Sequence, residues 1–409
     1  MTEAIDVVVV GAGQAGLAVS YELTRADVPH VVLERGRVGQ TWRGLWDSFR
    51  LIGPNWTVQL PGHPYDGEDR DGFLARDEVV AYLERYASAV DAPVRDGVDV
   101  TSLRRGRAGG FVLETSTGRM TAGTVVVSTG AYPRPHRPPC ASTLPADVAV
   151  LDVVDYRNPA GVPAGDVLVV GSGESGCQIA EELRLAGRNV CLACGRAPWV
   201  QRRIGDKDAM WWAVQGGFFE APFASLPHPK ARLGANIQIT GGLGGEHDLH
   251  YRTLQAIGVT LLGRFLGAEG HEARFAADLA ESVAWGDAVH AQLRGLVARV
   301  AAERGLAQPE MPDPEPFVAD APETLDLAGF GAVIFATGYR PDYASWVDIE
   351  DVVDELGFPL QHDGASTTVP GLYFVGVHFL RKRKSSLLLG VGEDAAIVAR
   401  QVAAEVAAV

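Results

Sequence analysis

The chain is poor in cysteine and has no long apolar run. Four cysteines among 409 residues are too few for the disulfide framework of small secreted domains. A membrane helix needs about 20 consecutive apolar residues, and no run approaches that length. We therefore expect a cytoplasmic protein that does not associate with membranes.

A basic amino-terminal segment and an excess of positive charge are also lacking. The first residues lead directly into an apolar strand, so we expect no signal peptide. The net charge is -15, and such a surface repels the phosphates of nucleic acids. Hydrophobic residues make up 47% and charged residues 21%, which is typical of a globular protein with a substantial core.

Glycine, in contrast, is abundant, and its first cluster forms a nucleotide-binding motif. Residues 5–10 (IDVVVV) predict a buried parallel strand, which is followed by GAGQAG, a helix and a second strand. Gly11 permits the tight turn, Gly13 the approach of the pyrophosphate, and Gly16 close packing of helix and strand. The helix amino terminus faces the phosphates with its partial positive charge. Glu34, 23 residues beyond Gly11, is placed to hold ribose hydroxyls. We assign this motif to FAD.

The same unit recurs later in the chain. Residues 167–170 (VLVV) lead into GSGESG, a helix and the strand NVCLACG. The position equivalent to Glu34 holds Cys194, and Arg196 and Arg202 follow soon after. A carboxylate repels a ribose 2′-phosphate and a guanidinium attracts it, so this motif predicts NADPH rather than NADH. The alternative is that Arg196 is an ordinary solvated arginine.

The two units predict an α/β fold with two Rossmann-like dinucleotide-binding domains. We expect three layers in each domain, as in the FAD/NAD(P) fold of disulfide reductases. Two buried strands end alike, in Thr129-Gly130 and in Thr337-Gly338, which also indicates a doubled architecture. The predicted FAD domain comprises residues 1–155 and 325–409. The predicted NADPH domain comprises residues 160–322, with a helical, aromatic-rich insertion at about 205–320.

Several features have both a functional and a structural interpretation. Cys191 and Cys194 form a CxxC that is either a redox dithiol or, as we favour, a pair of structural strand cysteines. His247 and His250 have HxxH spacing but no nearby third ligand, so we expect no metal. The basic run 381–384 either offsets phosphate charge or, as we favour, is a solvated loop. The aromatic residues that line a substrate cavity or, more simply, fill a core are Trp211, Trp212, Phe218 and Phe219.

The whole pattern resembles the class B flavin-dependent monooxygenases, which include the flavin-containing and the Baeyer–Villiger monooxygenases. The matching pieces are GAGQAG, Glu34, GQTWRGLWDSFRL, the first Thr-Gly strand, GSGESG, FATGY and LYFVG…GVGEDA. They occur in the right order over most of the chain, and the stretch 205–320 is the least covered.

The resemblance implies the cofactor contacts residue by residue. FAD would be held by the first motif and the segment after Glu34, with Arg43 near its phosphates: Gly11, Gly13, Gln14, Ala15, Gly16, Glu34, Arg35, Gln40, Thr41, Trp42, Arg43 and Gly130. NADPH would be held by Gly171, Gly173, Glu174, Ser175, Gly176, Arg196 and Arg202, close to Thr337 and Gly338. Gly390 and Gly392 open a terminal helix that either stabilises the charge of a reduced flavin or is simply well capped.

One departure concerns the linker before the second glycine motif. The family carries a fingerprint FxGxxxHxxx(Y/W) there, and Tyr156 matches its aromatic position. Asp152 stands in place of the histidine, and Ala146 and Val148 replace the phenylalanine and glycine. Because this linker couples the two domains, the departure puts oxygen transfer in doubt more than cofactor binding.

The resemblance implies an NADPH-dependent monooxygenase that uses a C4a-(hydro)peroxyflavin to oxygenate a small organic substrate at nitrogen, sulfur or a ketone. Substrate and O2 are the expected partners, and a homodimer is the family expectation. Asn55 is either a catalytic hydrogen-bond donor beside the flavin or a turn residue after Pro54. The alternatives are an NADPH oxidase or electron-transferring reductase, and a regulatory flavoprotein whose turnover is incidental.

Overall fold

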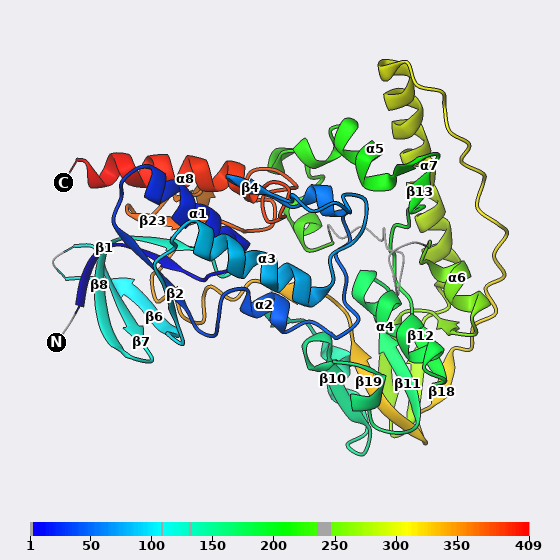
Figure 1. Ribbon diagram of the computed structural model, residues 1–409. Helices are drawn as coiled ribbons and strands as arrows, with labels where there is room; N and C mark the ends of the chain where they lie inside the picture. Colours follow the sequence, from blue (N-terminus) through cyan, green and yellow to red (C-terminus); the bar gives the residue numbers. More distant parts are fainter. Residues whose placement is uncertain (1–2, 108, 131–132, 235–246, 409) are drawn as a thin grey trace.

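The computed structural model describes residues 3–107, 109–130, 133–234 and 247–408 (Figure 1). It contains two larger sheets, each covered on both faces, and an insertion with a long helix beside the second sheet. Both chain termini lie at the outer side of the first sheet (Figure 1).

The first sheet has nine strands around β1 (Glu3–Val10). β1 pairs in parallel with β2 (His30–Glu34) and β8 (Gly118–Val127), so that Val8 lies between Val31 and Val125. Val8 is fully buried, as expected of a strand covered on both faces. The other strands of this sheet are β5 (Val94–Asp96), β6 (Val100–Arg105), β7 (Phe111–Thr115), β21 (Gln361–His362), β22 (Ala365–Ser366) and β23 (Leu372–Phe374).

Two different layers cover this first sheet. Val7 and Val9 share one core with the helices α1 (Gln14–Arg25), α3 (Arg76–Ala89) and α8 (Val391–Val406). Val8 and Val10 face the opposite core, with the antiparallel strands β6 and β7 and the segment 343–358. The predicted three-layer arrangement is therefore confirmed.

The second sheet consists of five parallel strands in the order β10 (Ala149–Asp152), β19 (Phe330–Phe335), β11 (Asp166–Val170), β12 (Val190–Ala193) and β15 (Thr260–Leu262). One face packs on α4 (Glu174–Leu185) and α6 (Tyr251–Ala256). The other face packs on an antiparallel layer of β16 (Phe265–Glu269), β17 (Glu272–Phe275) and β18 (Thr324–Asp326). The second domain thus repeats the layering of the first.

The domain boundaries differ from the predicted ones. β10 and β19 hydrogen-bond into the second sheet, although both were assigned to the FAD domain. The chain crosses between the domains where β9 (Arg134–Pro135) pairs with β20 (Tyr339–Arg340). The sequence does not mark this crossing because a buried parallel strand has the same apolar pattern in either sheet.

The insertion begins after β12 and folds beside the second domain. It contains the hairpin β13 (Arg203–Ile204) and β14 (Lys207–Asp208), the helix α5 (Ala209–Gln215) and the long helix α7 (Leu279–Arg304). The predicted insertion at about 205–320 is not helical throughout, since β15, β16 and β17 also lie within it. An extended linker, 305–323, returns along α7 (Figure 1). No helix among the described residues is both long and apolar enough to cross a membrane.

Candidate functional site: two glycine loops at strand ends

The first glycine loop joins β1 to α1 in a backbone that side chains would obstruct. Gly11 has a φ of +104°, and a Cβ there would lie 2.8 Å from the carbonyl oxygen of Ser128. A Cβ on Gly16 would lie 1.8 Å from the carbonyl oxygen of Gly11. Only glycine lets the helix start this close to the strand. Gly13 has open space at its Cβ position, which is where a pyrophosphate would approach.

Glu34 reaches back from the end of β2 to this loop. Its side chain is buried, and Oε2 accepts a hydrogen bond of 2.8 Å from the backbone N–H of Ala12. Oε1 accepts a hydrogen bond of 3.0 Å from the backbone N–H of Gly36. The carboxylate is therefore held at the loop, as a ribose-binding acid requires.

The second loop has the same backbone. Gly171 also has a φ of +104°, and its Cβ would lie 2.6 Å from the carbonyl oxygen of Ala336. A Cβ on Gly176 would lie 1.9 Å from the carbonyl oxygen of Gly171, and Gly173 again has open space. Both loops thus have the glycine pattern and the open middle position that a dinucleotide pyrophosphate needs.

The ribose side of the second loop is different. The hydroxyl of Ser172, the counterpart of Ala12, accepts a hydrogen bond of 2.9 Å from the backbone N–H of Gly195. The same hydroxyl lies 2.6 Å from the hydroxyl of Tyr251. No carboxylate stands at the end of β12, and Arg196 beyond it is exposed. A hydroxyl of the loop itself therefore joins loop and strand here, a device that the motif comparison did not reveal.

The two Thr-Gly strand ends lie behind the two loops and at the domain crossing. Gly130 and Gly338 have φ values of +86° and +82°, which favour glycine. The carbonyl oxygen of Gly130 accepts a hydrogen bond of 3.0 Å from the hydroxyl of Tyr343. Thr337 donates a hydrogen bond to the carbonyl oxygen of His136, beside the β9–β20 pair.

The segment after Glu34, residues 40–43, is predicted to line the flavin and is called the flavin-lining segment below. Its side chains contact the first loop. The indole N–H of Trp42, in α2 (Gln40–Arg43), donates to Gln14 Oε1 at 3.0 Å, and Gln14 Nε2 donates to the carbonyl oxygen of Ser386 at 3.2 Å. The Ser386 hydroxyl lies 3.3 Å from Nδ1 of His378, whose pKa burial lowers to about 4. This network brings together α1, α2 and the connection that leads to Gly390 at the start of α8. Sequence reasoning missed His378 and Ser386, because nothing local marks them.

Other predicted FAD contacts lie on the same segment. Arg35 and Thr41 are exposed, and Gln40 accepts a hydrogen bond of 3.3 Å from the N–H of Arg37. The guanidinium of Arg43 instead pairs with Glu84 on α3 and donates to a backbone carbonyl at 3.1 Å. The structure thus turns Arg43 to α3, and its place beside the cofactor phosphates stays a prediction.

The predicted roles of Asn55 and Arg202 are corrected, because both side chains are buried and bond to other groups of the protein. Asn55 is buried; its Nδ2 donates to the carbonyl oxygen of Asp69 at 2.8 Å, and its Oδ1 accepts from the N–H of Leu74 at 2.7 Å. It is therefore a structural turn residue rather than a catalytic donor. Arg202 is only 2% exposed and pairs with Asp208 at 2.9 Å, so its guanidinium is not available to a ribose phosphate.

The linker that departs from the family fingerprint is fastened to both domains. Asp152 pairs with Arg137 at 2.7 Å. The hydroxyl of Tyr156 donates to Glu182 on α4 at 2.8 Å, and burial raises the pKa of that carboxyl group. Arg157 donates to the carbonyl oxygen of Leu45 at 2.9 Å, next to the flavin-lining segment. The coupling role of this linker is thus supported by its contacts, with an ion pair where the histidine would be.

The aromatic insertion and the basic run pack against each other. Trp212 and Phe219 are buried in a cluster with α7, which favours the core interpretation. The solvated-loop interpretation of residues 381–384 is wrong. Lys382 pairs with Glu220 of the insertion at 2.7 Å and with Glu393 of α8 at 3.0 Å. The run therefore joins the insertion to the first domain.

The cysteines and histidines of the second domain take structural places. All four cysteines are free, and burial raises the pKa of Cys191 to about 11, which favours the structural interpretation of the CxxC. His247 bonds to Glu181 at 2.7 Å. The ring of His250 instead caps α6 by accepting from the N–H of Arg252 at 3.2 Å. The two histidines thus have different partners.

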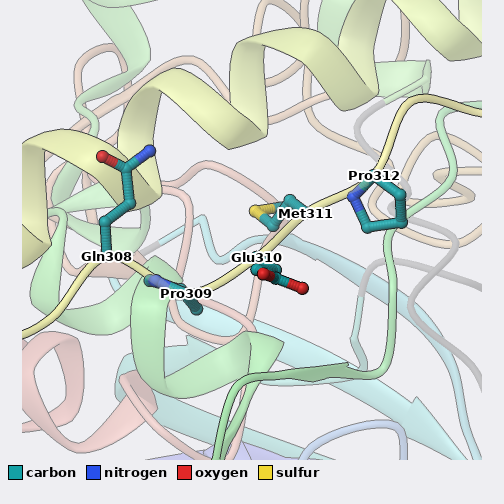
Figure 2. A pocket seen from close by; sticks show the side chains of 5 residues that line it. All are labelled: Gln308, Pro309, Glu310, Met311 and Pro312. Carbon is teal, nitrogen blue, oxygen red and sulfur yellow. The ribbon is translucent and has the colours of Figure 1, made fainter.

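A pocket of about 510 Å³ lies on the linker after α7 (Figure 2). It is lined by Gln308, Pro309, Glu310, Met311 and Pro312. Figure 2 shows these side chains along one extended stretch beside the helix. None of them belongs to a glycine loop, so we do not place a cofactor there.

Comparison with known proteins agrees with this geometry. The family model described as pyridine nucleotide-disulphide oxidoreductase matches residues 8–210. An uncharacterized CzcO-like oxidoreductase of Geobacillus kaustophilus is 30% identical over 399 residues, which cover 97% of each chain. The indole-3-pyruvate monooxygenase YUCCA1 of Oryza sativa is 31% identical over 180 residues, 43% of this chain and 44% of that protein.

The fold has a counterpart among solved structures. The flavin-containing monooxygenase of Stenotrophomonas maltophilia aligns with a TM-score of 0.69 and 21% identity, over 99% of this chain and 100% of that one. The expected fold class and the resemblance to class B flavin monooxygenases are confirmed. The chain belongs to the CzcO-like oxidoreductases, flavin-dependent enzymes of the pyridine nucleotide-disulphide oxidoreductase fold.

Proposed function

We propose that this protein is an FAD-containing, NADPH-dependent monooxygenase that transfers one oxygen atom of O2 to a small organic substrate. The observation that carries the proposal is the pair of glycine loops with matching backbones and opposite ribose sides. Glu34 is held at the first loop, whereas the exposed Arg196 follows the second. The family membership supports a flavin and a nicotinamide cofactor in one chain.

The residues at the first loop fit the ADP half of FAD. Gly13 leaves room for the pyrophosphate, the amino terminus of α1 faces it, and Glu34 would accept from the ribose hydroxyls. Gln14 and Trp42 would border the flavin, with the amino terminus of α8 behind them. When bound, the flavin supplies the redox and oxygen chemistry that amino-acid side chains lack.

The residues at the second loop fit a phosphorylated dinucleotide. Gly173 leaves the pyrophosphate its place at the start of α4, and Ser175 lies in the first turn. The hydroxyl of Ser172 accepts a hydrogen bond from the backbone N–H of Gly195, the residue before Arg196. A guanidinium there would attract a 2′-phosphate and a carboxylate would not, which supports NADPH.

The expected reaction consumes one NADPH, one proton and one O2 per substrate and yields NADP+, water and the oxygenated product. We keep the substrate to a class, a molecule with an oxidisable nitrogen or sulfur or a ketone, because the match to the plant indole-3-pyruvate monooxygenase covers only 43% of this chain. The homodimer is likewise a proposal, to be tested by the mass in solution.

The experiment measures NADPH oxidation, O2 uptake, hydrogen peroxide and oxygenated product with a panel of amines, sulfides and ketones. Product formed in proportion to NADPH supports the proposal. NADPH consumption that yields only stoichiometric hydrogen peroxide with every substrate would contradict it.

That second outcome corresponds to an NADPH oxidase, and one observation favours it. Asp152 occupies the fingerprint histidine position and is paired with Arg137. If this departure weakens oxygen transfer, D152H should lower the peroxide yield per NADPH. An unchanged yield would show that the departure is harmless.

A further inference from the structure

Arg202 makes a contact between the two domains that the cofactor motifs do not explain. It follows β12 in the second domain, and its side chain and that of Asp208 are both 2% exposed. Their charged groups are 2.9 Å apart. Asp208 also caps α5 by accepting from the N–H of Met210 at 2.8 Å. Asp208, at the start of α5 in the insertion, therefore binds one side of the guanidinium.

The other side of the guanidinium contacts the first domain. Nη1 donates to the carbonyl oxygen of Ile52 at 2.6 Å. The guanidinium carbon lies 4.0 Å from the centre of the Phe73 ring. Both partners belong to the stretch that continues the predicted flavin-lining segment, and an arginine stacked on an aromatic ring gains a cation–π attraction.

Asn55 joins the two segments of the first domain that contact Arg202, those of Ile52 and Phe73. Its side chain bonds to Asp69 and Leu74, on either side of Phe73, and its N–H donates to the carbonyl oxygen of Gly72 at 2.8 Å. The loop that carries Phe73 is therefore tied to the loop that carries Ile52. A displacement of Arg202 would shift both.

The pKa of Arg202 is also influenced by a residue of the second glycine loop. Burial lowers the pKa of Arg202, while the negative charges of Asp208 and Glu174 oppose this. Glu174 lies in the first turn of α4, inside GSGESG. The guanidinium thus pairs with the insertion and donates to the first domain. A buried ion pair adds little stability compared with apolar packing, and its best-attested use is to select one arrangement.

We propose that Arg202 is a positioning residue that fixes the insertion of the second domain against the flavin domain for hydride transfer. This inference rests on the proposed function, in which a hydride passes from the nicotinamide to the flavin and solvent supplies the proton. It differs from a 2′-phosphate contact because it predicts an effect on the rate of flavin reduction rather than on cofactor affinity.

The test compares R202M with R203M in the purified flavoprotein. Arg203 is its exposed neighbour on β13 and donates within its own hairpin, to the carbonyl oxygen of Asp206 at 3.0 Å. Anaerobic stopped flow gives the limiting rate of flavin reduction and the Kd for NADPH. We expect R202M to lower the limiting rate about tenfold or more with a Kd within about threefold, R202K to recover part of the loss, and R203M to match the unmodified protein.

A second measurement does not depend on turnover. Hydrogen exchange of residues 52–57, 69–74 and 172–177 should become faster in R202M and stay unchanged in R203M, while photoreduction of the flavin is unaffected. If R202M does not fold because Asp208 is left unpaired, F73L and the double variant R202M/D208L take its place, since neither buries a single charge.

The outcomes separate this inference from the proposed function. If neither NADPH nor NADH reduces the flavin of the unmodified protein, the proposed function fails, and the exchange data still decide whether Arg202 joins the domains. Unchanged exchange and an unchanged reduction rate overturn the inference. A raised Kd with an unchanged limiting rate also overturns it, because it assigns Arg202 to the cofactor phosphate.

Discussion

The two glycine loops of this protein have nearly the same backbone geometry, but they differ in the hydrogen bond that joins each loop to its strand end. In both, the first glycine has a φ of +104°, and a Cβ on the third would lie within 2 Å of a carbonyl oxygen of the same loop, at 1.8 and 1.9 Å. At the first loop, a carboxylate from the strand end bonds to the loop backbone. At the second, a hydroxyl of the loop bonds to the strand-end backbone. The two loops therefore share the glycine pattern of a dinucleotide site and differ in the group that joins the loop to the strand end.

The largest expected effect comes from a methyl group at the third glycine of either loop. In G16A and G176A the new Cβ meets a backbone oxygen, and overpacking costs about 1–3 kcal/mol, which is roughly 5- to 150-fold in affinity. We expect G16A to purify with little flavin, and G176A to keep its flavin but to need far more NADPH for reduction.

Flavin absorbance and the concentration dependence of reduction check this. G295A is the matched control, because Gly295 is exposed on α7 and its Cβ position is open. If G176A lost flavin and G16A kept it, the two loops would have to be exchanged in the assignment.

The next largest effect is expected from Arg196, at the ribose side of the second loop. R196E places at the second loop the charge that Glu34 brings to the first. Because a hydrogen bond to a charged group contributes about 1.5–3 kcal/mol, kcat/KM for NADPH should fall roughly 10- to 150-fold. The value for NADH should change little. R299E, at an exposed position of α7, controls for the added charge. Equal losses with both cofactors would show that Arg196 does not read the phosphate.

A smaller effect concerns acid stability, because each domain buries a neutral histidine. Burial lowers the pKa of His378, near the first loop, and of His290, which stacks on Trp199 after β12, to about 4. Below the ordinary pKa of about 6.5, the unfolded chain binds protons that the folded chain does not. Stability should therefore fall as the pH drops from about 6.5 to about 4, by at most ~1.4 kcal/mol per pH unit for each histidine.

Urea unfolding between pH 4 and 7 checks the slope. H378F and H290F should each flatten it, and H378F should also change the pH at which flavin is released. A slope unaffected by either substitution would show that other groups cause the acid lability.

The smallest effect is expected at Cys191 in β12, three residues before Cys194, which stands at the position equivalent to Glu34. Because burial raises its pKa to about 11, little reactive thiolate exists near neutral pH. C191S should keep flavin reduction and turnover within about twofold. A larger loss of turnover with intact flavin would revive the redox interpretation of the CxxC.

Local patterns were sufficient for much of the fold and for the cofactor loops. The apolar strands, the glycine spacing and Glu34 were recognised because each depends on residues close together in the chain. The domain boundaries were wrong because β10 enters the second sheet by pairing with β19, which is remote from it in sequence. The basic run 381–384 was misread for the same reason, since its partner Glu220 lies in the insertion.

What the sequence by itself determined is where the two glycine loops lie and how the residues at their strand ends differ. Backbone conformations that exclude a Cβ require glycine at set positions, and the length of one βαβ unit sets the distance to the ribose-side residue. Only the tertiary structure decided what Arg202 and Asn55 do. The Ile52 carbonyl that receives Arg202 is 150 residues away along the chain, and only the packing of the two domains brings them together.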